Sequence, residues 1–471
     1  MLFDADFTIT IDGKGVPTAS DLEIINPATA RPFARAPRAD AADLEAAVLA
    51  ARSAFPGWRD TAVSERRRVL LTLADRIADN SVNLGRLFTL EQGRPLSQAL
   101  REILSAANWL RSVASQDLPI DVVEDSEARR VEVHHLPLGV VAAIVPWNFP
   151  VLLAIWKIAP ALLAGNTVVL KPSPYTPLCA LKIGEIARGI LPPGVLNVVS
   201  GDDALGPMMS VHPGFAKISF TGSTATGKRV MASAAADLKR ITLELGGNDA
   251  AIVLADADPD VVAEAMFAGA FFNSSQVCIA TKRLYIHDDI YDAVRDRLHA
   301  LADWAVIGDG LREGVTHGPV QNLAQFRRVQ SLAADAEALG LKVFRGGNVE
   351  VGAGYFLPLM IVDNPPEAAA VVQEEAFGPI LPLMRFTDID EVIDRANDSV
   401  YGLAGSVWSR DARRALDVAL RMEAGSVWIN QNRQVAAHVP FAGFKQSGYG
   451  IENGLAGLLE FTQTKAIYIP K

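Results

Sequence analysis

Cys278 is one of only two cysteines in the chain and lies in the segment FFNSSQVCIATKR (271–283). A free cysteine usually fills a core as a small hydrophobic side chain. The alternative is a thiolate nucleophile, which requires a base and a group that stabilises the negative charge formed during attack. The segment alone does not distinguish these interpretations, so other parts of the sequence must supply the missing groups.

Two other segments carry side chains with the required chemistry. In LELGGND (243–249), Glu244 precedes two glycines, and a carboxylate in such an apolar segment can be a base with a raised pKa. In PWNFP (146–150), the amide of Asn148 can donate to an oxyanion. Each residue also has an ordinary structural interpretation, as a capping or ion-paired glutamate and as a turn asparagine.

The glycine-rich segment FTGSTATGK (220–228) matches the GxxxxGK pattern of P-loops that bind nucleoside triphosphates. The next residue is Arg229, where a P-loop needs a Ser or Thr hydroxyl for magnesium. Free amides at a helix start, with the Ser223 and Thr224 hydroxyls, would still hold a pyrophosphate. A glycine-rich turn without a ligand remains open as well.

The composition excludes several classes of protein. The chain has 44 basic and 54 acidic residues and a formal charge of -10, which disfavours a nucleic-acid partner. No cysteine pair or histidine spacing fits a metal site, and two cysteines form no disulfide framework. Prolines and Lys157 interrupt the most apolar region, 138–170, so we expect no membrane span. Because MLFDADFTIT also lacks a secretory signal, these features predict a reducing, cytoplasmic location.

The order of predicted elements indicates an α/β fold. Amphipathic helix patterns cover 41–55 and 65–77, and the arginine triplet 66–68 is expected on the solvated face of the second. Cys179, in another helical run, is expected to be a core thiol. Strands are predicted at 140–145, 167–170, 195–199, 217–220 and 241–245, with helices at 178–188 and 226–235. A second alternating series runs from 250–254 to 425–430. This alternation predicts two α/β domains with mostly parallel sheets.

Seven motifs together make the chain resemble the aldehyde dehydrogenase superfamily along nearly its whole length. They are PWNFP, LKPSPYTP, FTGSTATG, LELGG, SSQVC, EEAFGP and PFAGFKQSG. Cys278 follows Glu244 by 34 residues, the family's usual gap between base and nucleophile. The resemblance implies that Cys278 attacks an aldehyde, and that Asn148 and the Cys278 backbone amide stabilise the oxyanion. Hydride transfer to NAD(P) would then leave a thioester, which water activated by Glu244 would hydrolyse.

The same resemblance implies a set of coenzyme contacts. Lys171 would reach the adenosine ribose, Ser223 the pyrophosphate, Trp147 the cleft wall, and Glu375 and Phe377 the nicotinamide ribose and ring. The other expected coenzyme-site residues are Ser173, Pro174, Gly222 and Gly246. Pro174 stands where many NAD-preferring members carry a glutamate, so NADP use is permitted. NAD is preferred on family grounds, and use of both coenzymes stays open.

Positions that match the family's aldehyde tunnel are Leu153, Trp156, Ile279, Val435 and Phe441. This apolar, partly aromatic lining favours an uncharged aliphatic or aromatic aldehyde as the small-molecule partner. Arg433 belongs to the loop expected at the tunnel mouth. If its side chain points inward, an ω-carboxylated substrate such as a semialdehyde is the alternative.

The fold implied by the resemblance is α/β, with a Rossmann-like coenzyme domain, an α/β catalytic domain and a small β oligomerisation element. The expected boundaries are 1–117 with 138–246 for the coenzyme domain and 247–458 for the catalytic domain. The oligomerisation element comprises 118–137 and 459–471. Because this element extends sheets between subunits in the family, a homodimer or homotetramer is expected.

Overall fold

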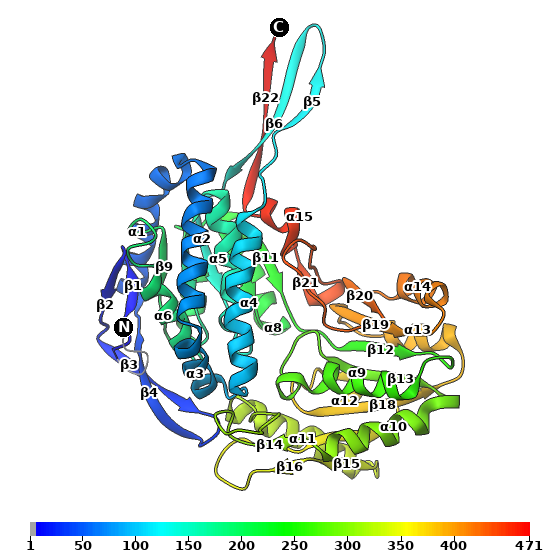
Figure 1. The fold of residues 1–471 in the computed structure, drawn as a ribbon. Coiled ribbons are helices and arrows are strands. Elements are labelled where there is room, and N and C mark those ends of the chain that lie inside the picture. The colour runs from blue at the N-terminus through cyan, green and yellow to red at the C-terminus, as the bar shows by residue number, and fades with distance from the viewer. Residues whose placement is uncertain (1–5) are drawn as a thin grey trace.

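Two large sheets and a projecting arm make up the computed structural model, which describes residues 6–471 (Figure 1). The first sheet has the strand order β2-β1-β9-β8-β7-β10-β11-β21, and the second has the order β15-β17-β18-β13-β12-β19-β20. Helices cover both sheets, so the predicted α/β class with a Rossmann-like first body is confirmed. The prediction that residues 1–10 carry no secretory signal concerns in part residues 1–5, which lie outside the described residues.

The first sheet has a parallel centre made of β7 to β11. Its strands are β1 (Ile9–Ile11), β2 (Lys14–Val16), β7 (Val140–Ile144), β8 (Thr167–Lys171), β9 (Leu196–Val198), β10 (Lys217–Thr221), β11 (Arg240–Glu244) and β21 (Gly448–Tyr449). The helices of this part of the chain are α1 (Ala41–Asp60), α2 (Val63–Asp79), α3 (Ser81–Gln92), α4 (Leu96–Ala114), α5 (Leu152–Ala164), α6 (Leu178–Ala187), α7 (Leu205–Val211) and α8 (Thr224–Ala234). All five residues of β7 are buried, as expected for a strand with helices on both faces.

The second sheet is parallel except for β15 at its edge. Its strands are β12 (Asp249–Val253), β13 (Thr281–His287), β15 (Val343–Gly346), β17 (Leu359–Asp363), β18 (Ile380–Phe386), β19 (Ala404–Trp408) and β20 (Ser426–Ile429). The helices of this part are α9 (Pro259–Phe271), α10 (Asp288–Asp303), α11 (Leu323–Ala338), α12 (Ala370–Gln373), α13 (Ile389–Asn397), α14 (Ala412–Arg421) and α15 (Gly454–Leu459).

The arm is a three-stranded antiparallel sheet that projects from the rest of the molecule (Figure 1). Its order is β22 (Thr462–Pro470), β6 (Arg129–Pro137), β5 (Asp121–Asp125). Two further small sheets pair β3 (Ser20–Asn26) with β4 (Arg31–Arg38), and β14 (Val306–Ile307) with β16 (Asn348–Val349). Within residues 6–471, no helix combines the length and apolar character needed to cross a bilayer.

The prediction for the arginine triplet is wrong at its first residue. Arg66 is only 5% exposed, and its Nη1 donates to the carbonyls of Arg59 at 3.1 Å and Thr61 at 2.9 Å. These groups belong to the end of α1, whose last carbonyls have no partner within the helix. Arg66 therefore stabilises that helix end. Cys179 is fully buried in α6, as predicted.

Candidate active site

Cys278 lies in the loop that leads from α9 into β13, next to an unusual run of backbone conformations. Asn273, Ser274 and Ser275 all have left-handed φ angles, of 52°, 50° and 62°. Hydrogen bonds hold this run: Ser274 Oγ donates to the Gly318 carbonyl at 2.7 Å, and Gln276 Oε1 accepts from the Gln321 amide at 2.8 Å. The chain thus reaches Cys278 through a buried, strained and firmly hydrogen-bonded turn.

Asn148 follows β7 and contacts the cysteine loop directly. Its side chain is 3% exposed, and its Nδ2 donates to the Gln276 carbonyl at 3.0 Å. The Asn148 carbonyl accepts from Arg94, whose guanidinium pairs with Glu102 at 2.6 Å. Glu102 in turn accepts from the amide of Leu152 at 3.1 Å, at the start of α5. Both charges of the pair are buried, so this network fixes the Asn148 turn against α4 and α5.

Glu244 ends β11 and is 4% exposed. Among residues 6–471, neither of its carboxylate oxygens has a hydrogen-bond partner. Burial raises the pKa of Glu244 well above its usual range, the nearby Glu452 carboxylate raises it further, and the Lys157 ammonium opposes the shift. At neutral pH this carboxyl group therefore holds its proton more tightly than an exposed glutamate does.

Lys157 and Glu452 form a buried ion pair beside Glu244, joining α5 to the segment before α15. Ser219 Oγ adds a hydrogen bond to Glu452 Oε1 at 3.3 Å. Sequence reasoning did not assign either charge to the site. The available signal was Lys157 itself, a lone cation in the apolar helix LLAIWKIAPALLA, because a fully buried lysine needs a partner.

The two glycines after Glu244 allow three chain segments to meet. A Cβ at Gly246 would lie 2.3 Å from Glu375 Oε2, and one at Gly247 would lie 2.8 Å from the Cys278 carbonyl oxygen. The Gly247 amide donates to Glu375 Oε1 at 3.1 Å. Lys282 Nζ donates to the Cys278 carbonyl at 2.6 Å and lies 3.7 Å from Glu375 Oε1. Sequence reasoning missed Lys282, although it stands in the cysteine segment.

Burial raises the pKa of the Cys278 thiol to about 12. The Lys282 ammonium opposes this shift, whereas the carboxyl groups of Asp249, Glu375 and Glu244 add to it. A thiol with so high a pKa is almost entirely protonated at neutral pH. Burial and the surrounding charges together therefore determine how readily a thiolate forms at Cys278.

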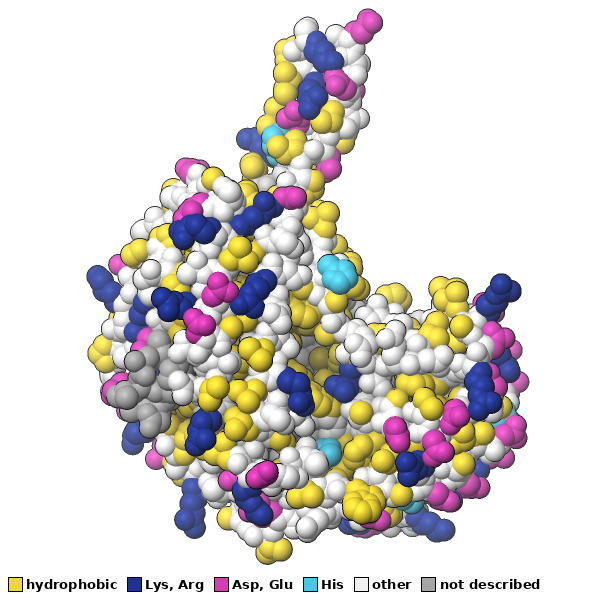
Figure 2. All heavy atoms as spheres, in the orientation of Figure 1, with side chains coloured by type: hydrophobic (Ala, Val, Ile, Leu, Met, Phe, Trp, Pro, Cys, Tyr) yellow, Lys and Arg dark blue, Asp and Glu magenta, His cyan; other side chains and the backbone are white. Residues whose placement is uncertain are grey.

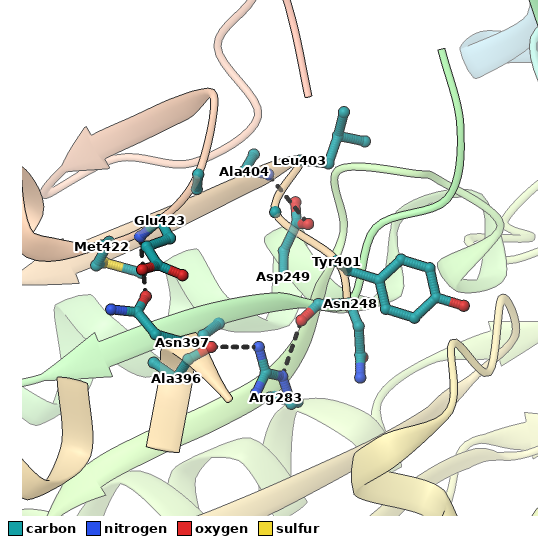
Figure 3. Close-up of a pocket in the computed structure, with 13 residues that line it drawn as sticks. Asn248, Asp249, Arg283, Ala396, Asn397, Tyr401, Leu403, Ala404, Met422 and Glu423 are labelled. Carbon is teal, nitrogen blue, oxygen red and sulfur yellow. Dashed lines mark hydrogen bonds between the residues drawn. The ribbon is translucent and has the colours of Figure 1, made fainter. Parts of the chain in front are cut away.

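A small pocket lies next to the turn that follows Gly247, and Figure 3 shows the side chains that line it. Asp249 Oδ1 accepts from the Ala404 amide at 3.2 Å, and Arg283 donates to the carbonyls of Asn248 and Ala396, both at 2.8 Å. Burial raises the pKa of Asp249 to about 7, while Lys282 opposes the shift. These bonds join the turn after Gly247 to the second sheet. The residues that line the pocket therefore hold that turn in place.

The expected nicotinamide-site residues lie together. The rings of Trp147 and Phe377 meet edge to face with centroids 5.4 Å apart, and Glu375 lies two residues before Phe377. Phe377 has a left-handed φ of 49°, a strained conformation that is found at ligand-binding sites. An aromatic wall beside a carboxylate that can accept from ribose hydroxyls has suitable chemistry for a nicotinamide riboside.

The other expected coenzyme residues lie at the carboxyl ends of β8 and β10, where ligands of open α/β sheets bind. Ser223 caps α8, and its Oγ accepts from the Thr226 amide at 3.3 Å. The Gly222 amide is already bonded to the Glu244 carbonyl at 3.0 Å, so it is not one of the free amides. Lys171 and Ser173 are buried, and Pro174 is half-buried. The start of α8 and a buried lysine suit the phosphates and ribose of a dinucleotide.

The predicted tunnel residues form one apolar cluster. Leu153, Trp156, Ile279 and Phe441 are buried in the core of the first body, and Val435 and Cys278 pack against it. Trp156 meets Phe441 edge to face at 5.6 Å and stacks on Trp109 at 5.0 Å. Trp109 is an aromatic contact that sequence reasoning missed. Arg433 is half-buried, with its guanidinium 4.5 Å from the centre of the Phe272 ring.

Figure 2 shows one face of the molecule as a space-filling surface. A hollow lies between the part built on α2 and α4 and the part built on α9 and α10, and its interior is mainly hydrophobic. Basic side chains flank it on both sides. The hollow has the apolar lining and sparse charge of a small-molecule site.

Known proteins match both the sequence and this arrangement. Residues 16–467 match the model of the aldehyde dehydrogenase family. Phenylacetaldehyde dehydrogenase of Pseudomonas fluorescens is 40% identical, with 98% of this chain and 95% of that protein covered. The NAD+ complex of aldehyde dehydrogenase from Bacillus cereus has a TM-score of 0.97 at 34% identity, covering 99% of this chain and 97% of that one. An NADP-dependent enzyme from E. coli has a TM-score of 0.95 at 37% identity, covering 98% of each chain.

These matches extend over nearly the whole chain, and the P-loop alternative has no support in the site, where Arg229 is exposed. The activity of the protein is the NAD(P)-dependent oxidation of aldehydes. The chain belongs to the aldehyde dehydrogenase family.

Proposed function

We propose that Cys278 is the nucleophile, Asn148 the oxyanion donor and Glu244 the base in this oxidation. The observation that supports the proposal is the convergence of three buried loops. The Asn148 amide contacts the carbonyl two residues before Cys278, and the turn after Glu244 packs on the Cys278 carbonyl. The unpartnered Glu244 carboxyl also acts electrostatically on the thiol.

In this mechanism, Cys278 Sγ attacks the aldehyde carbonyl carbon as a thiolate. A C–S bond forms, and the carbonyl oxygen takes the negative charge, which the Asn148 Nδ2 and the Cys278 backbone amide stabilise. Each such donor is worth about 3 kcal/mol in the transition state. NAD(P), when bound, supplies the oxidising power by accepting hydride from the substrate carbon.

The Cys278 thioester is then hydrolysed. Glu244 takes a proton from water, the resulting hydroxide attacks the thioester carbon, and the Cys278 thiolate leaves as the carboxylic acid is released. Because its raised pKa makes Glu244 a stronger base than an exposed carboxylate, proton removal is favoured once the group is ionised. The neighbouring ion pair acts on the pKa of Glu244 in both directions, because Glu452 raises it and Lys157 lowers it.

For coenzyme binding, we assign Lys171, Ser173 and Pro174 to the adenosine ribose side, and Trp147, Glu375 and Phe377 to the nicotinamide side. Ser223 and the start of α8 would hold the pyrophosphate, Gly222 would form the turn that leads to them, and Gly246 would leave room for Glu375. Burial lowers the pKa of Lys171 to about 8, and the Asp203 carboxylate opposes this shift. A carboxylate whose charge acts on Lys171 would also disfavour the 2′-phosphate of NADP, which supports a preference for NAD.

The apolar cluster around Trp156 supports a substrate with an aliphatic or aromatic body. The related phenylacetaldehyde dehydrogenase has a substrate of this kind in its name.

We further assign 1–117 with 138–246 to coenzyme binding, 247–458 to catalysis, and 118–137 with 459–471 to assembly into a homodimer or homotetramer. Both cysteines are free thiols, which supports a reducing, cytoplasmic location.

The test follows reduced-nicotinamide formation with hexanal and phenylacetaldehyde in three variants. Cys278→Ala should abolish turnover, whereas Cys179→Ala, which removes the other thiol, should retain it. Glu244→Gln should retain a rapid burst stoichiometric with enzyme and lower the steady-state rate by about 100-fold or more. Turnover by Cys278→Ala, or an unchanged steady-state rate in Glu244→Gln, would contradict the assignments.

A further inference from the structure

Two guanidinium groups contact the ring of Phe272, which begins the turn that leads to Cys278. The Arg94 guanidinium lies 5.6 Å from the ring centre, and the Arg433 guanidinium lies 4.5 Å from it. Phe272 also stacks on Phe149, with centroids 6.4 Å apart, and Phe149 follows the proposed oxyanion donor. Both cations therefore lie at the wall of the proposed aldehyde site.

The two arginines differ in their charge balance. Arg94 is neutralised by the buried carboxylate of Glu102 at 2.6 Å. Arg433 has no ion pair and no hydrogen bond to any side chain or carbonyl among residues 6–471, and its Nε is buried without a partner. Burial, together with the nearby Arg94, lowers the pKa of Arg433 to about 10. The wall thus carries one uncompensated positive charge.

The loop that carries Arg433 is held on both sides. Asn432 Nδ2 donates to the Ala265 carbonyl in α9 at 2.8 Å, and the Gln434 carbonyl accepts from Trp428 Nε1 at 2.9 Å. Arg433 itself has a left-handed φ of 50°, which is costly for a long side chain. A partly desolvated, unpaired cation on strained backbone lowers the stability of the folded protein. Strained residues of this kind are found mainly at ligand-binding sites.

Within the function proposed above, on which this inference rests, we propose that Arg433 binds a carboxylate at the far end of the substrate. The preferred aldehyde then has an apolar body, which contacts the aromatic cluster, and a terminal carboxylate, which pairs with the guanidinium. Arginine suits this role because its planar fork can donate two parallel hydrogen bonds to one carboxylate. Arg433 is thereby a specificity-determining residue.

The test compares kcat/KM for 5-oxopentanoate and 6-oxohexanoate with that for their neutral methyl esters, which have the same reacting group. We expect wild-type enzyme to prefer one of the acids over its ester by about 10- to 100-fold, the range for a charge-assisted hydrogen bond. Arg433→Gln should bring this ratio close to unity, and Arg433→Lys should retain part of it. Arg410→Gln, at an exposed arginine paired with Asp258, should keep the wild-type ratio.

An acid-to-ester ratio at or below unity in wild-type enzyme, or one that Arg433→Gln leaves unchanged, would overturn the inference. A wild-type ratio at or below unity overturns the inference even if the variants do not fold. A second measurement needs no turnover: hexanedioate should raise the melting temperature of wild-type enzyme more than hexanoate does, and Arg433→Gln should remove the difference. If hexanedioate stabilises the enzyme but no aldehyde is oxidised, the Arg433 site is retained and the proposed function is rejected. If only the esters are oxidised, the proposed function is retained and the Arg433 site is rejected.

Discussion

The reactivity of Cys278 depends on charges that burial makes influential. Its pKa is raised to about 12, and Lys282 is the group that most opposes this shift. Lys282 also donates to the Cys278 carbonyl at 2.6 Å, so its ammonium lies next to the backbone of the proposed nucleophile. In a buried site such a cation favours the thiolate over the thiol. We therefore propose that Lys282 positions Cys278 and lowers the pKa of its thiol.

We predict that Lys282→Met slows alkylation of Cys278 by iodoacetamide about 10-fold at any pH between 7 and 10, which corresponds to about one further pKa unit. The thiolate is the reactive form, and a pKa of about 12 lies above this range. The alkylation rate should thus rise with pH in both proteins, with the variant's profile displaced to higher pH.

The measurement is made in a Cys179→Ala background so that only Cys278 reacts. Lys239→Met is the matched control, because Lys239 is a similarly buried lysine that pairs with Asp237 instead. Equal alkylation rates for the Lys282 variant and its parent would show that Lys282 does not tune the thiol.

At the residue scale, the sequence indicated the proposed reactive groups but not the partners that surround them. Cys278, Glu244 and Asn148 stand in motifs that can be recognised without knowing the fold. Their supporting pairs are distant in the chain: Lys157 and Glu452 come from α5 and the segment before α15, and Arg94 reaches the Asn148 carbonyl. Only the folded chain brings such charges together, so neither pattern nor propensity indicates them.

Among the elements, the turn 273–275 is the most strained part of the site. Three successive non-glycine residues adopt left-handed backbone there. Asparagine tolerates this conformation, but serine does so at a cost of about 1–2 kcal/mol. The hydrogen bonds of Ser274 and Gln276 offset that cost and keep the following cysteine in place.

We predict that Ser275→Gly stabilises the protein by about 0.5 to 1 kcal/mol, because glycine removes most of the strain at φ 62° while adding some flexibility to the unfolded chain. Ser274→Ala should destabilise it by about 1 kcal/mol, because the bond to the Gly318 carbonyl is lost. The measurement is the urea midpoint of unfolding for both variants. A lower midpoint for Ser275→Gly would mean that the left-handed turn is not the source of strain.

Element prediction succeeded where local pattern and tertiary packing agree. The five strands predicted between 140 and 245 correspond to β7 to β11, with shifts of one residue at some ends. The short strands β1, β2 and β21 were missed, because they have two or three residues each, and β1 and β21 join the sheet by pairing with the distant strands β9 and β11. The first helix was predicted to end at Phe55, but α1 continues through the exposed Pro56 to Asp60. Trp58, bonded to the Leu162 carbonyl at 3.1 Å, anchors that last turn.

At the scale of the whole molecule, the arm is the feature that a single chain does not explain. It extends away from both bodies, and β22 pairs with β6 along its whole length, from Thr462–Pro137 to Pro470–Arg129 (Figure 1). Its strands nevertheless expose large apolar side chains; Val123 is 63% exposed and Tyr468 is 65% exposed. Its two outer strands, β5 and β22, also present unpaired backbone edges. Projecting apolar edges of this kind are suited to pairing with another chain.

We therefore propose that chains assemble through the arm, and we predict that the combined variant Val123→Lys and Tyr468→Lys remains a single chain of 50.4 kDa where the wild-type protein assembles. Lysines on facing arms would repel each other and would have to be desolvated on association. Sedimentation velocity measures the result, with Val351→Lys as control, because Val351 is 99% exposed but lies outside the arm. Since the proposed active-site residues all come from one chain, the dissociated variant should retain the burst of reduced nicotinamide. A wild-type protein that sediments as a single chain, or an arm variant that stays assembled, would show that the arm has another role.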